Sequence, residues 1–383
     1  GVQIVPPFDA EIAAAIEATP PADQVPMNDD LVQAVDPRDE YVAEAVKLAS
    51  GDEAARADLR IVLTAMHGVG ASMTARVLAE AGFANVSLVA AQAEPDPDFP
   101  TVPFPNPEEA GALDMAIEQA RAEGADLIIA VDPDADRCAL AVPDPGAEAG
   151  WSPLSGDQIG CLLGEFLAAR GLEGSLANSI VSSRLLARIA EAHGLVHHTT
   201  LTGFKWIARA PKLAFGYEEA IGFCPNPQIA RDKDGIASSV VAASLFAALK
   251  VEGRTAWDEL DRLAHVHGLH VTGPLTFRVE EIEQIAAGMA RLRAQPPSVL
   301  AGSPVVEVSD LSEGYRGLPP TDGVLVVTEA GDRVIARPSG TEPKLKCYLE
   351  VILPAPEGEP VPWEAARERL ELIKSEFGRI IGL

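Results

Sequence analysis

The sequence predicts a multi-domain α/β protein, with two three-layer α/β domains followed by a smaller α+β domain. From Asp39 to about Leu269, apolar runs typical of strands alternate with helical patterns, which indicates α/β layers around a largely parallel sheet. After His270 the order changes to a strand, a helix, several further strands and a closing helix. A length of 383 residues also exceeds what one hydrophobic core usually supports, so several domains are expected.

Residues 37–151 are expected to form the first α/β domain and residues 152–270 the second, with the Pro- and Gly-rich stretch Pro143–Pro153 between them. Apolar residues at helical or strand period predict the elements of both domains. In the first domain they are strand Ile61–Met66, helix Ser72–Ala81, helix Glu108–Ala122 and strand Leu127–Asp132. In the second they are helix Asp157–Ala169, strand Ile180–Ser182, strand Ala214–Tyr217 and helix Ile236–Leu249.

Residues 271–383 are expected to form the α+β domain. Its predicted elements include strand Leu275–Val279, helix Glu281–Leu292, strand Val334–Ala336 and helix Glu364–Phe377. Residues 1–36 show a strand at Gly1–Val5, a helix at Asp9–Ala18 and a Pro-rich connector. We interpret these first residues as the C-terminal tail of another α/β domain whose body is missing from the chain.

The composition narrows the class of protein. Hydrophobic residues make up 47% of the chain, but no apolar run approaches the roughly 18 residues that span a bilayer, so no membrane association is expected. A formal net charge of −27 disfavours nucleic acids and anionic membranes as partners. The four cysteines lack the spacing of a metal site or a disulfide framework, which suits a reducing cytoplasm.

Three aspartates, Asp132, Asp134 and Asp136, follow a predicted strand. Because alternate residues of an extended segment point the same way, their carboxylates are expected to converge. Crowded like charges call for a neutralising cation, and oxygen ligands suit a hard ion, Mg²⁺ or Ca²⁺. An EF-hand loop would need Gly and Glu where Arg137 and Pro143 stand, which excludes that type of site. An acidic turn without a metal remains the alternative.

A second group of polar residues, Arg337–Lys344, follows the predicted strand Val334–Ala336. Two cations, two hydroxyls and a glycine fall within these eight residues. A phosphate dianion requires such donors, and a glycine lets backbone N–H groups approach it closely. The segment therefore predicts a phosphate-binding loop, with an ordinary polar turn as the alternative.

Two adjacent carboxylates, Glu218 and Glu219, lie between Gly216 and Gly222 after another predicted strand. Adjacent carboxylates can accept hydrogen bonds from vicinal sugar hydroxyls, whereas a solvated acidic turn is the alternative reading. This segment is therefore a candidate sugar-binding loop.

Further cations for an anionic ligand stand nearby in the sequence. Arg231 and Lys233 precede a predicted helix, and Lys205 follows Gly203 in a tight turn. Asp234 is predicted to cap the helix that follows it. In the same way, Ser155 and Gln158 predict a capping box at the start of helix Asp157–Ala169.

Taken together, Asp132–Arg137, Gly216–Gly222 and Arg337–Lys344 resemble the metal, sugar-recognition and phosphate-binding loops of the α-D-phosphohexomutase superfamily, in the same order. Members of this superfamily include phosphoglucomutases and phosphomannomutases. Three further stretches look most like the branch that contains phosphopentomutases and glucose-1,6-bisphosphate synthases: His67–Gly70, Pro95–Glu109 and Thr202–Trp206. The resemblance covers nearly the whole chain.

The resemblance implies a four-domain enzyme that interconverts glucose or mannose 1-phosphate and 6-phosphate. A phosphoserine in the first domain donates its phosphoryl group, and the resulting sugar 1,6-bisphosphate, also the activator, returns the other one. The chain has no loop of the Thr-Ala-Ser-His-Asn-Pro type that carries this serine, so we expect the chain alone to be inactive. The implied partners are small-molecule sugar phosphates, and the implied form is a cytoplasmic monomer or homodimer.

The resemblance also implies a role for each candidate residue. Asp132, Asp134 and Asp136 would hold Mg²⁺, while Arg137 and Lys205 would stabilise charge at the transferring phosphoryl group. Glu218 and Glu219 would bind sugar hydroxyls. The other residues that would contact the substrate or its distal phosphate are Gly203, Arg231, Lys233, Arg337, Ser339, Gly340, Thr341 and Lys344.

Two departures from the family pattern leave the sugar and the general base open. Ala220 stands where many relatives have Ser, and Phe223 ends the loop where some bacterial relatives have a candidate base, His. A phosphopentomutase and a glucose-1,6-bisphosphate synthase therefore stay as alternatives, as does a non-catalytic sugar-phosphate binding fragment. An aspartate-based phosphatase using Asp132 would leave Arg337–Lys344 without a role.

Overall fold

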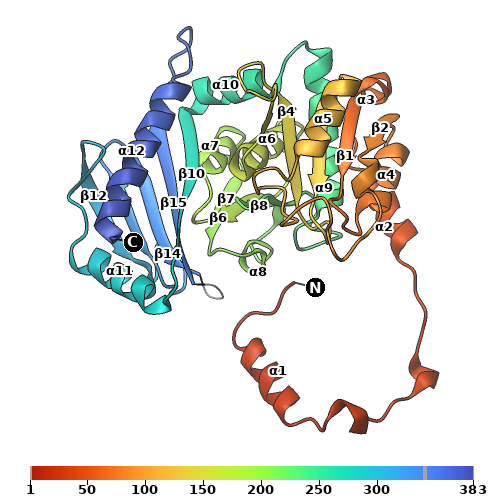
Figure 1. The fold of residues 1–383 in the computed structure, drawn as a ribbon, viewed down its shortest axis with the longest axis horizontal. Helices are drawn as coiled ribbons and strands as arrows, with labels where there is room; N and C mark the ends of the chain where they lie inside the picture. The colour runs from red at the N-terminus through yellow and green to blue at the C-terminus, as the bar shows by residue number, and fades with distance from the viewer. Residues whose placement is uncertain (1, 340–342, 383) are drawn as a thin grey trace. The chain divides into compact units, whose positions relative to one another are not determined.

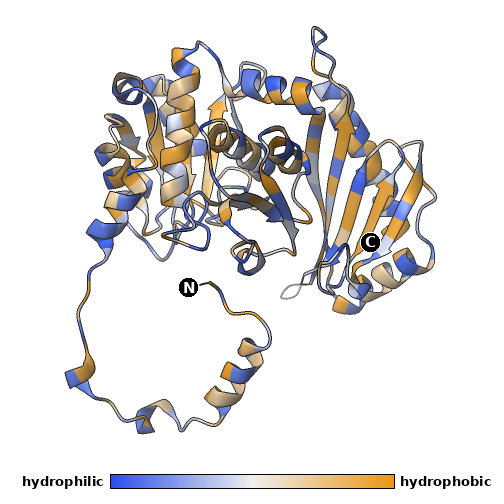
Figure 2. Cartoon of the chain, turned by 180° about the vertical axis from the view of Figure 1, so that it is seen from behind, coloured by the Kyte–Doolittle hydropathy of each residue, from blue (hydrophilic) through white to orange (hydrophobic). Residues whose placement is uncertain are grey.

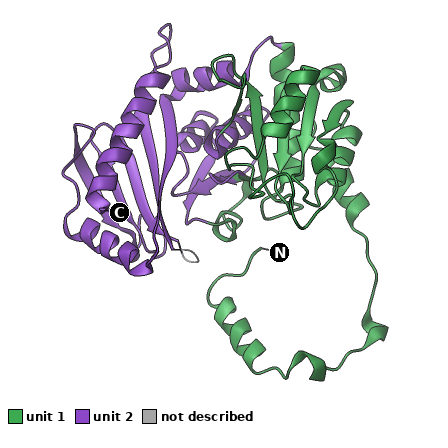
Figure 3. Ribbon diagram, viewed as in Figure 1, with its two compact units in different colours: residues 1–154, 203–216, 222–251 green, residues 155–202, 217–221, 252–383 purple. Residues whose placement is uncertain are grey.

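The computed structural model describes residues 2–339 and 343–382 of the chain. The chain forms two compact units, each assembled from segments that are separated in the sequence (Figure 3). Unit 1 contains Gly1–Leu154, Gly203–Gly216 and Gly222–Val251. Unit 2 contains Ser155–Thr202, Tyr217–Ile221 and Glu252–Leu383. Helices and strands alternate over most of the chain, which confirms the predicted mixed α/β class.

The sheet of unit 1 has the strand order β2-β1-β3-β4-β5 (Figure 1). β1 runs parallel to β2 and β3, whereas β4 is antiparallel to β3 and β5. The expected largely parallel sheet is therefore a mixed sheet. Six residues, 132–137, separate β3 from β4, too few for a crossover, so the chain turns back beside β3. The strands are β1 (Arg60–Thr64), β2 (Asn85–Leu88), β3 (Leu127–Val131), β4 (Cys138–Pro143) and β5 (Trp151–Pro153).

Helices cover this sheet, with α5 packed against β1 and β3, and α9 packed against β3 and β4. α9 is mostly buried, as its uninterrupted run of small and apolar residues predicts. The α-helices of unit 1 are α1 (Phe8–Glu17), α2 (Arg38–Val46), α3 (Glu53–Asp58), α4 (Ala71–Glu80), α5 (Asp114–Glu123), α8 (Phe204–Ile207) and α9 (Gly235–Val251). Short 3₁₀ turns are η1 (Ala22–Gln24), η2 (Asp29–Leu31) and η3 (Ala90–Gln92).

Two predicted elements of unit 1 differ from the structure. The helix expected at Glu108–Ala122 begins only at Asp114, because Gly111 has a φ of 81°, a conformation that a right-handed helix excludes. Residues 2–5, predicted as a strand, pair with no strand in the described part of the chain, and a strand needs a paired neighbour. The helix that follows them, α1, buries none of its residues.

The first part of unit 2 pairs β6 and β7 in parallel. Ser155 Oγ accepts from the Gln158 N–H at 3.2 Å and Gln158 Oε1 accepts from the Ser155 N–H at 2.9 Å, which confirms the predicted capping box. The strand predicted at Ile180–Ser182 is wrong. β6 ends at Ser179, and Ile180 and Val181 turn to pack against the C-terminal sheet. The elements are α6 (Gly156–Ala168), β6 (Ser175–Ser179), α7 (Leu185–Ala192) and β7 (Val196–Thr200).

Two further strands, β8 (Leu213–Glu218) and β9 (Gly222–Cys224), complete a sheet of order β7-β6-β8-β9. β8 ends at Glu218, and the segment 219–221 leads directly into β9. The strand predicted at Ala214–Tyr217 is thereby confirmed. The two adjacent carboxylates of the candidate sugar-binding loop stand at the point where β8 ends.

The rest of unit 2 is an antiparallel sheet of order β10-β15-β14-β13-β12-β11, with α11 and α12 packed against it (Figure 1). Successive residues of β14 serve different cores: Val334 and Ala336 join the core beneath the two helices, and Ile335 joins the cluster with Ile180 and Val181. Both faces of β14 are therefore covered. The elements are α10 (Ala256–His267), β10 (Leu269–Arg278), α11 (Ile282–Ala294), β11 (Val299–Leu300), β12 (Ser303–Asp310), η4 (Leu311–Glu313), β13 (Val324–Thr328), β14 (Arg333–Pro338), β15 (Lys344–Leu353) and α12 (Trp363–Ile381).

In Figure 2 the strands are coloured mainly as hydrophobic residues, whereas the helices contain both hydrophobic and hydrophilic residues. Within the described residues, no single helix is long and apolar enough to cross a membrane. α9 and α10 pass such a test only when counted together across the bend that separates them.

Candidate active site

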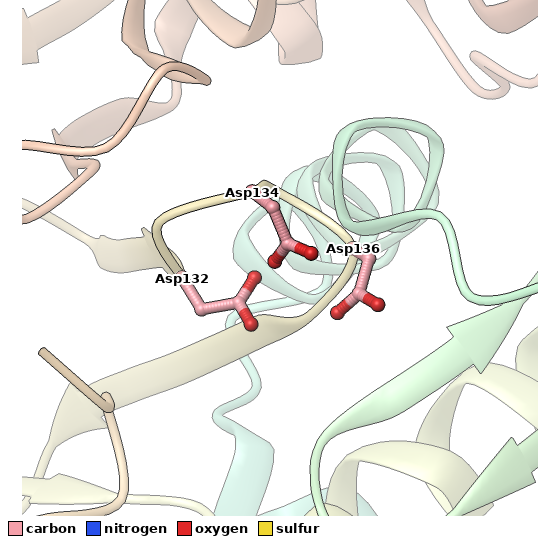
Figure 4. A group of neighbouring side chains, drawn as sticks. All are labelled: Asp132, Asp134 and Asp136. Atoms are coloured by element: carbon pink, nitrogen blue, oxygen red, sulfur yellow. The ribbon is translucent and has the colours of Figure 1, made fainter. Parts of the chain in front are cut away.

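The three aspartates predicted as metal ligands gather in the turn that follows β3 (Figure 4). One carboxylate oxygen from each lies within 4.8 Å of the others, with Asp132 buried, Asp136 half-buried and Asp134 exposed. Ala135 takes a left-handed φ of 59°, which reverses the chain between the last two aspartates. The Arg137 N–H donates to Asp132 Oδ1 at 3.0 Å. This turn can hold a hard cation between three carboxylates.

The electrostatics of the turn favour a bound cation. Burial raises the pKa of Asp132 to about 6, and the charges of Asp136 and Asp134 act in the same direction against the Arg137 N–H. A divalent cation would remove this cost, because it favours all three ionised forms. Arg137 Nε lies 4.0 Å from both Asp132 and Asp136, and it is buried without a hydrogen-bond partner among the described residues. A phosphate oxygen is the acceptor that such a donor suits.

Two glycines explain why the turn holds its shape. A Cβ on Gly68 would lie 2.4 Å from Pro133 Cα, and one on Gly235 would lie 2.3 Å from the Arg137 carbonyl oxygen. The Val69 N–H donates to Pro133 O at 2.9 Å, and the Gly235 N–H donates to Ala135 O at 3.1 Å. The turn that carries the three aspartates is therefore packed between the turn before α4 and the start of α9. His67, in the same turn, contacts Thr101 at 2.9 Å, the arrangement of a structural histidine.

The candidate cations of unit 1 differ in their burial and in their neighbours. Lys233 Nζ lies 2.9 Å from Asp136 Oδ2 and 5.6 Å from the centroid of the Phe204 ring, beside the metal turn. Lys205 is half-buried on α8, which starts after Gly203, whereas Arg231 is exposed. Asp234 accepts from the Ala237 N–H at 2.8 Å, which confirms its predicted capping role.

In unit 2, Glu219 is held by residues that the sequence did not single out. Ser179 Oγ and Ser182 Oγ donate to Glu219 Oε2 at 3.0 Å and 2.9 Å. Asp157, beneath the same loop, accepts from the Tyr217 hydroxyl at 2.8 Å and from the Ser183 N–H at 2.6 Å. Two signals were present: Asp157 lies inside the capping box of Ser155 and Gln158, and serines cluster at the end of β6.

The predicted phosphate loop follows β14. Arg337 is half-buried on that strand, opposite Lys346 of β15, and the Ser339 N–H donates to Lys344 O at 2.9 Å. Gly340 and Thr341 lie outside the described residues. Burial raises the pKa of Tyr348, and the charges of Glu219 and Glu218 act with it while Arg337 opposes them. The charges of Glu218, Glu219 and Arg337 therefore all influence the pKa of the Tyr348 phenol.

The fold and these loops define a class of protein: a multi-domain α/β protein that combines a turn of three aspartates with further carboxylates and cations on separate loops. Three family models match this chain in order. They describe the phosphoglucomutase/phosphomannomutase alpha/beta/alpha domain II at residues 39–146, alpha/beta/alpha domain III at residues 155–265 and C-terminal domain at residues 248–359. The chain belongs to the phosphoglucomutase/phosphomannomutase family, and its resemblance to the α-D-phosphohexomutase superfamily is confirmed.

Individual relatives agree with this membership. The chain is 43% identical over 361 residues to a probable phosphomannomutase of Haemophilus influenzae, covering 91% of this chain and 72% of the relative. It is 32% identical over 398 residues to a probable phosphoribomutase of Schizosaccharomyces pombe, covering 91% of this chain and 66% of that protein. The crystal structure of a putative phosphomannomutase from Thermus thermophilus has the same fold, with a TM-score of 0.65 at 23% identity over 89% of this chain and 66% of that one. The chain thus spans roughly two thirds to three quarters of the length of these relatives.

Proposed function

We propose that the chain carries the metal, sugar and phosphate loops of a phosphosugar mutase that interconverts hexose 1-phosphate and 6-phosphate. The observation that carries this proposal is the set of three aspartates whose oxygens lie within 4.8 Å of one another, bordered by Arg137 and Lys233. A carboxylate cage next to cations suits a metal that itself contacts a phosphoryl group. Membership of the family supports the same reaction.

In the proposed reaction, Asp132, Asp134 and Asp136 would hold Mg²⁺, which would supply positive charge to offset that of a phosphoserine. A sugar hydroxyl attacks that phosphorus, the bond between phosphorus and the serine oxygen breaks, and the hydroxyl proton passes to a base that we do not assign. The sugar bisphosphate then reorients, and its other phosphoryl group is transferred to the serine. Arg137 and Lys205 offset the negative charge of the transferring group.

Substrate binding is the proposed task of the remaining candidate residues, which include Gly203, Arg231 and Lys233. Glu218 and Glu219 would accept hydrogen bonds from the sugar hydroxyls. Arg337, Ser339 and Lys344, with Gly340 and Thr341, would bind the distal phosphate. We propose glucose or mannose phosphates as substrates and a sugar 1,6-bisphosphate as activator, with a monomer or homodimer as the working form.

The phosphoryl donor is a serine in a loop of the Thr-Ala-Ser-His-Asn-Pro type in this family, and the 383 residues contain no such loop. We therefore propose that these residues alone bind sugar phosphates without exchanging them. Turnover should require a polypeptide that also supplies the phosphoserine.

Calorimetric titration of the 383-residue chain tests the proposal. Glucose 6-phosphate and mannose 6-phosphate should bind more tightly than inorganic phosphate. Mg²⁺ should bind at the turn of three aspartates. Ribose 5-phosphate tests the pentose alternative. If neither hexose phosphate binds better than inorganic phosphate, the proposed function is wrong.

A further inference from the structure

Glu219 differs from an ordinary surface carboxylate because two serines direct it. Ser179 and Ser182 each expose about 1% of their surface, and their hydroxyls donate to the same oxygen, Oε2, at 3.0 Å and 2.9 Å. Within the described residues, no hydrogen bond engages the other oxygen, Oε1. The carboxylate is thus oriented by one oxygen and offers the other to a ligand.

Both serine hydroxyls can donate to Glu219 Oε2 at the same time. Each serine has a single hydroxyl hydrogen, and the two hydroxyl oxygens also lie 2.9 Å apart. When both hydrogens point to Oε2, neither hydroxyl donates to the other. Hydrogen bonds donated to an ionised carboxylate are stronger than those to a neutral acceptor. The pair of serines therefore acts as a clamp, which we call the serine clamp.

The backbone of the same loop is seated on the first turn of α6. A Cβ on Gly156 would lie 2.0 Å from Glu219 O, and one on Gly160 would lie 2.5 Å from the Tyr217 ring. Tyr217 itself is fully buried and donates to Asp157 at 2.8 Å. Because both the backbone and one carboxylate oxygen are held, Glu219 has little freedom to follow a ligand.

The serine clamp is also attached to the strand that carries Arg337. Arg333, on the same strand β14, donates to Ile180 O at 2.8 Å and to Ser182 O at 2.6 Å. The guanidinium of Arg333 is buried and lies 3.1 Å from Glu350 Oε2. Two hydrogen bonds from one guanidinium therefore link the loop that orients Glu219 to the strand that leads into the phosphate loop.

We propose that Ser179 and Ser182 are positioning residues that determine selectivity for a phosphorylated sugar with free ring hydroxyls. They orient Glu219 so that Oε1 faces those hydroxyls. Arg333 maintains the separation between Glu219 and Arg337. This inference rests on the proposed function and deepens it. A phosphorylated ligand without a sugar ring gains nothing from the serine clamp.

The test is calorimetric titration of the 383-residue chain with glucose 6-phosphate, glycerol 3-phosphate and inorganic phosphate. Replacing both serines (S179A with S182A) should weaken glucose 6-phosphate binding about tenfold, the order expected for losing hydrogen bonds to a charged group. Binding of glycerol 3-phosphate and inorganic phosphate should stay within about twofold. The control is Ser244→Ala, which removes a buried serine hydroxyl bonded to Val240 O on α9.

A double-mutant cycle separates positioning from a structural role. In a Glu219→Ala background, the two serine substitutions should have no further effect on glucose 6-phosphate binding, since their effect acts through that carboxylate. If the double serine variant does not fold, as judged by circular dichroism, Ser179→Ala alone is measured, with an expected loss of about threefold.

The outcomes are distinguishable from failure of the proposed function. If the unsubstituted chain binds glucose 6-phosphate no better than inorganic phosphate, the function itself is wrong. If it does discriminate and the serine variants keep the same discrimination, the function stands and the clamp is overturned. An equal loss for all three ligands, or an effect that persists without Glu219, would also overturn it.

Discussion

At the scale of single residues, the candidate site depends on carboxylates in unlike surroundings. Asp132 is buried, Asp134 is exposed, and both belong to the same turn of six residues. Asp157 is fully buried with two hydrogen-bond donors, whereas Glu219 is half-buried with two serine hydroxyls. We therefore expect these acids to have different roles, which the burial and the hydrogen-bond donors of each one determine.

Asp134 offers the most direct test of the metal turn. Asp134→Asn should weaken Mg²⁺ or Mn²⁺ binding at least tenfold, because an amide oxygen replaces one of three charged ligands. Since Asp134 is exposed, the thermal stability of the metal-free protein should hardly change. Calorimetric titration with Mn²⁺ measures the effect, with the exposed Asp98→Asn as the matched control. Unchanged affinity would rule out the turn as the metal site.

Asp157 gives a pH dependence of stability. Burial raises its pKa to about 6, above the usual value of 3.8, against the opposing Ser183 N–H. Its contribution to stability is therefore fully present below about pH 4 and lost as the pH rises through about 6. Asp157→Asn should remove this loss, so the variant should gain roughly 1–3 kcal/mol relative to the parent between pH 4 and pH 7.

Chemical denaturation at a series of pH values measures that difference. Asp98→Asn, which changes an exposed carboxylate in the same way, should show no such trend with pH. A constant difference between Asp157→Asn and the parent protein would mean that Asp157 ionises normally in the fold.

At the scale of elements, tight contacts at glycines position the loops. The first residue of α9 meets the metal turn, and the first residue of α6 meets the sugar loop. In each case a helix start approaches a neighbouring backbone too closely for any side chain. These contacts explain why the loops keep defined shapes without strand pairing of their own.

Gly235→Ala should disturb the metal turn, because its Cβ would lie 2.3 Å from the Arg137 carbonyl. The expected cost is about 1–3 kcal/mol of stability, as for overpacking of a core, together with weaker Mn²⁺ binding. Gly378→Ala on α12 is the matched control, since its nearest atom would lie 3.7 Å away. Thermal unfolding and Mn²⁺ titration compare the two variants. Equal melting temperatures and equal Mn²⁺ affinities would contradict the role of α9 in holding the turn.

At the scale of the whole molecule, the chain gathers distant segments into each unit. In unit 2, Arg184, His270 and Arg333 surround the buried carboxylate of Glu350. This carboxylate lies 2.6 Å from Arg184, 3.0 Å from His270 and 3.1 Å from Arg333. Burial alone would raise the pKa of Glu350, but Arg333, His270 and Arg184 hold it well below the usual value. This ion cluster ties α7 and the turn before it to strands β10, β14 and β15.

Glu350→Gln should destabilise unit 2 by about 3–5 kcal/mol, because it leaves buried cations without their counter-charge. The stability that Glu350 contributes is present above its usual pKa of 4.5 and is lost as the pH falls through its lowered pKa. Thermal unfolding at pH 7 measures the effect, with the exposed Glu357→Gln as control. Equal melting temperatures for these two variants would show that the cluster adds no stability.

Local patterns in the sequence were sufficient to predict most of the elements and the family. α4, α6, α9 and α12 follow their predicted spans closely, because apolar periodicity and capping residues act within a few residues. The cluster of three aspartates was predicted for the same reason, because they fall within five consecutive positions, 132–136. The acids, the phosphate loop and the sugar loop together identified the superfamily.

Contacts between distant residues were decided only by the tertiary structure. Ser179 and Ser182 meet Glu219 across 40 and 37 positions of the chain, and Arg333 meets the serine clamp across about 150. No periodicity predicts such pairs, since they depend on which strand ends become neighbours. The turn at Ile180 was missed for the same reason, because Ile180 and Val181 pack against the C-terminal sheet. The sequence by itself determined which chemical groups this protein carries, and the packing of its elements decided how those groups are aimed.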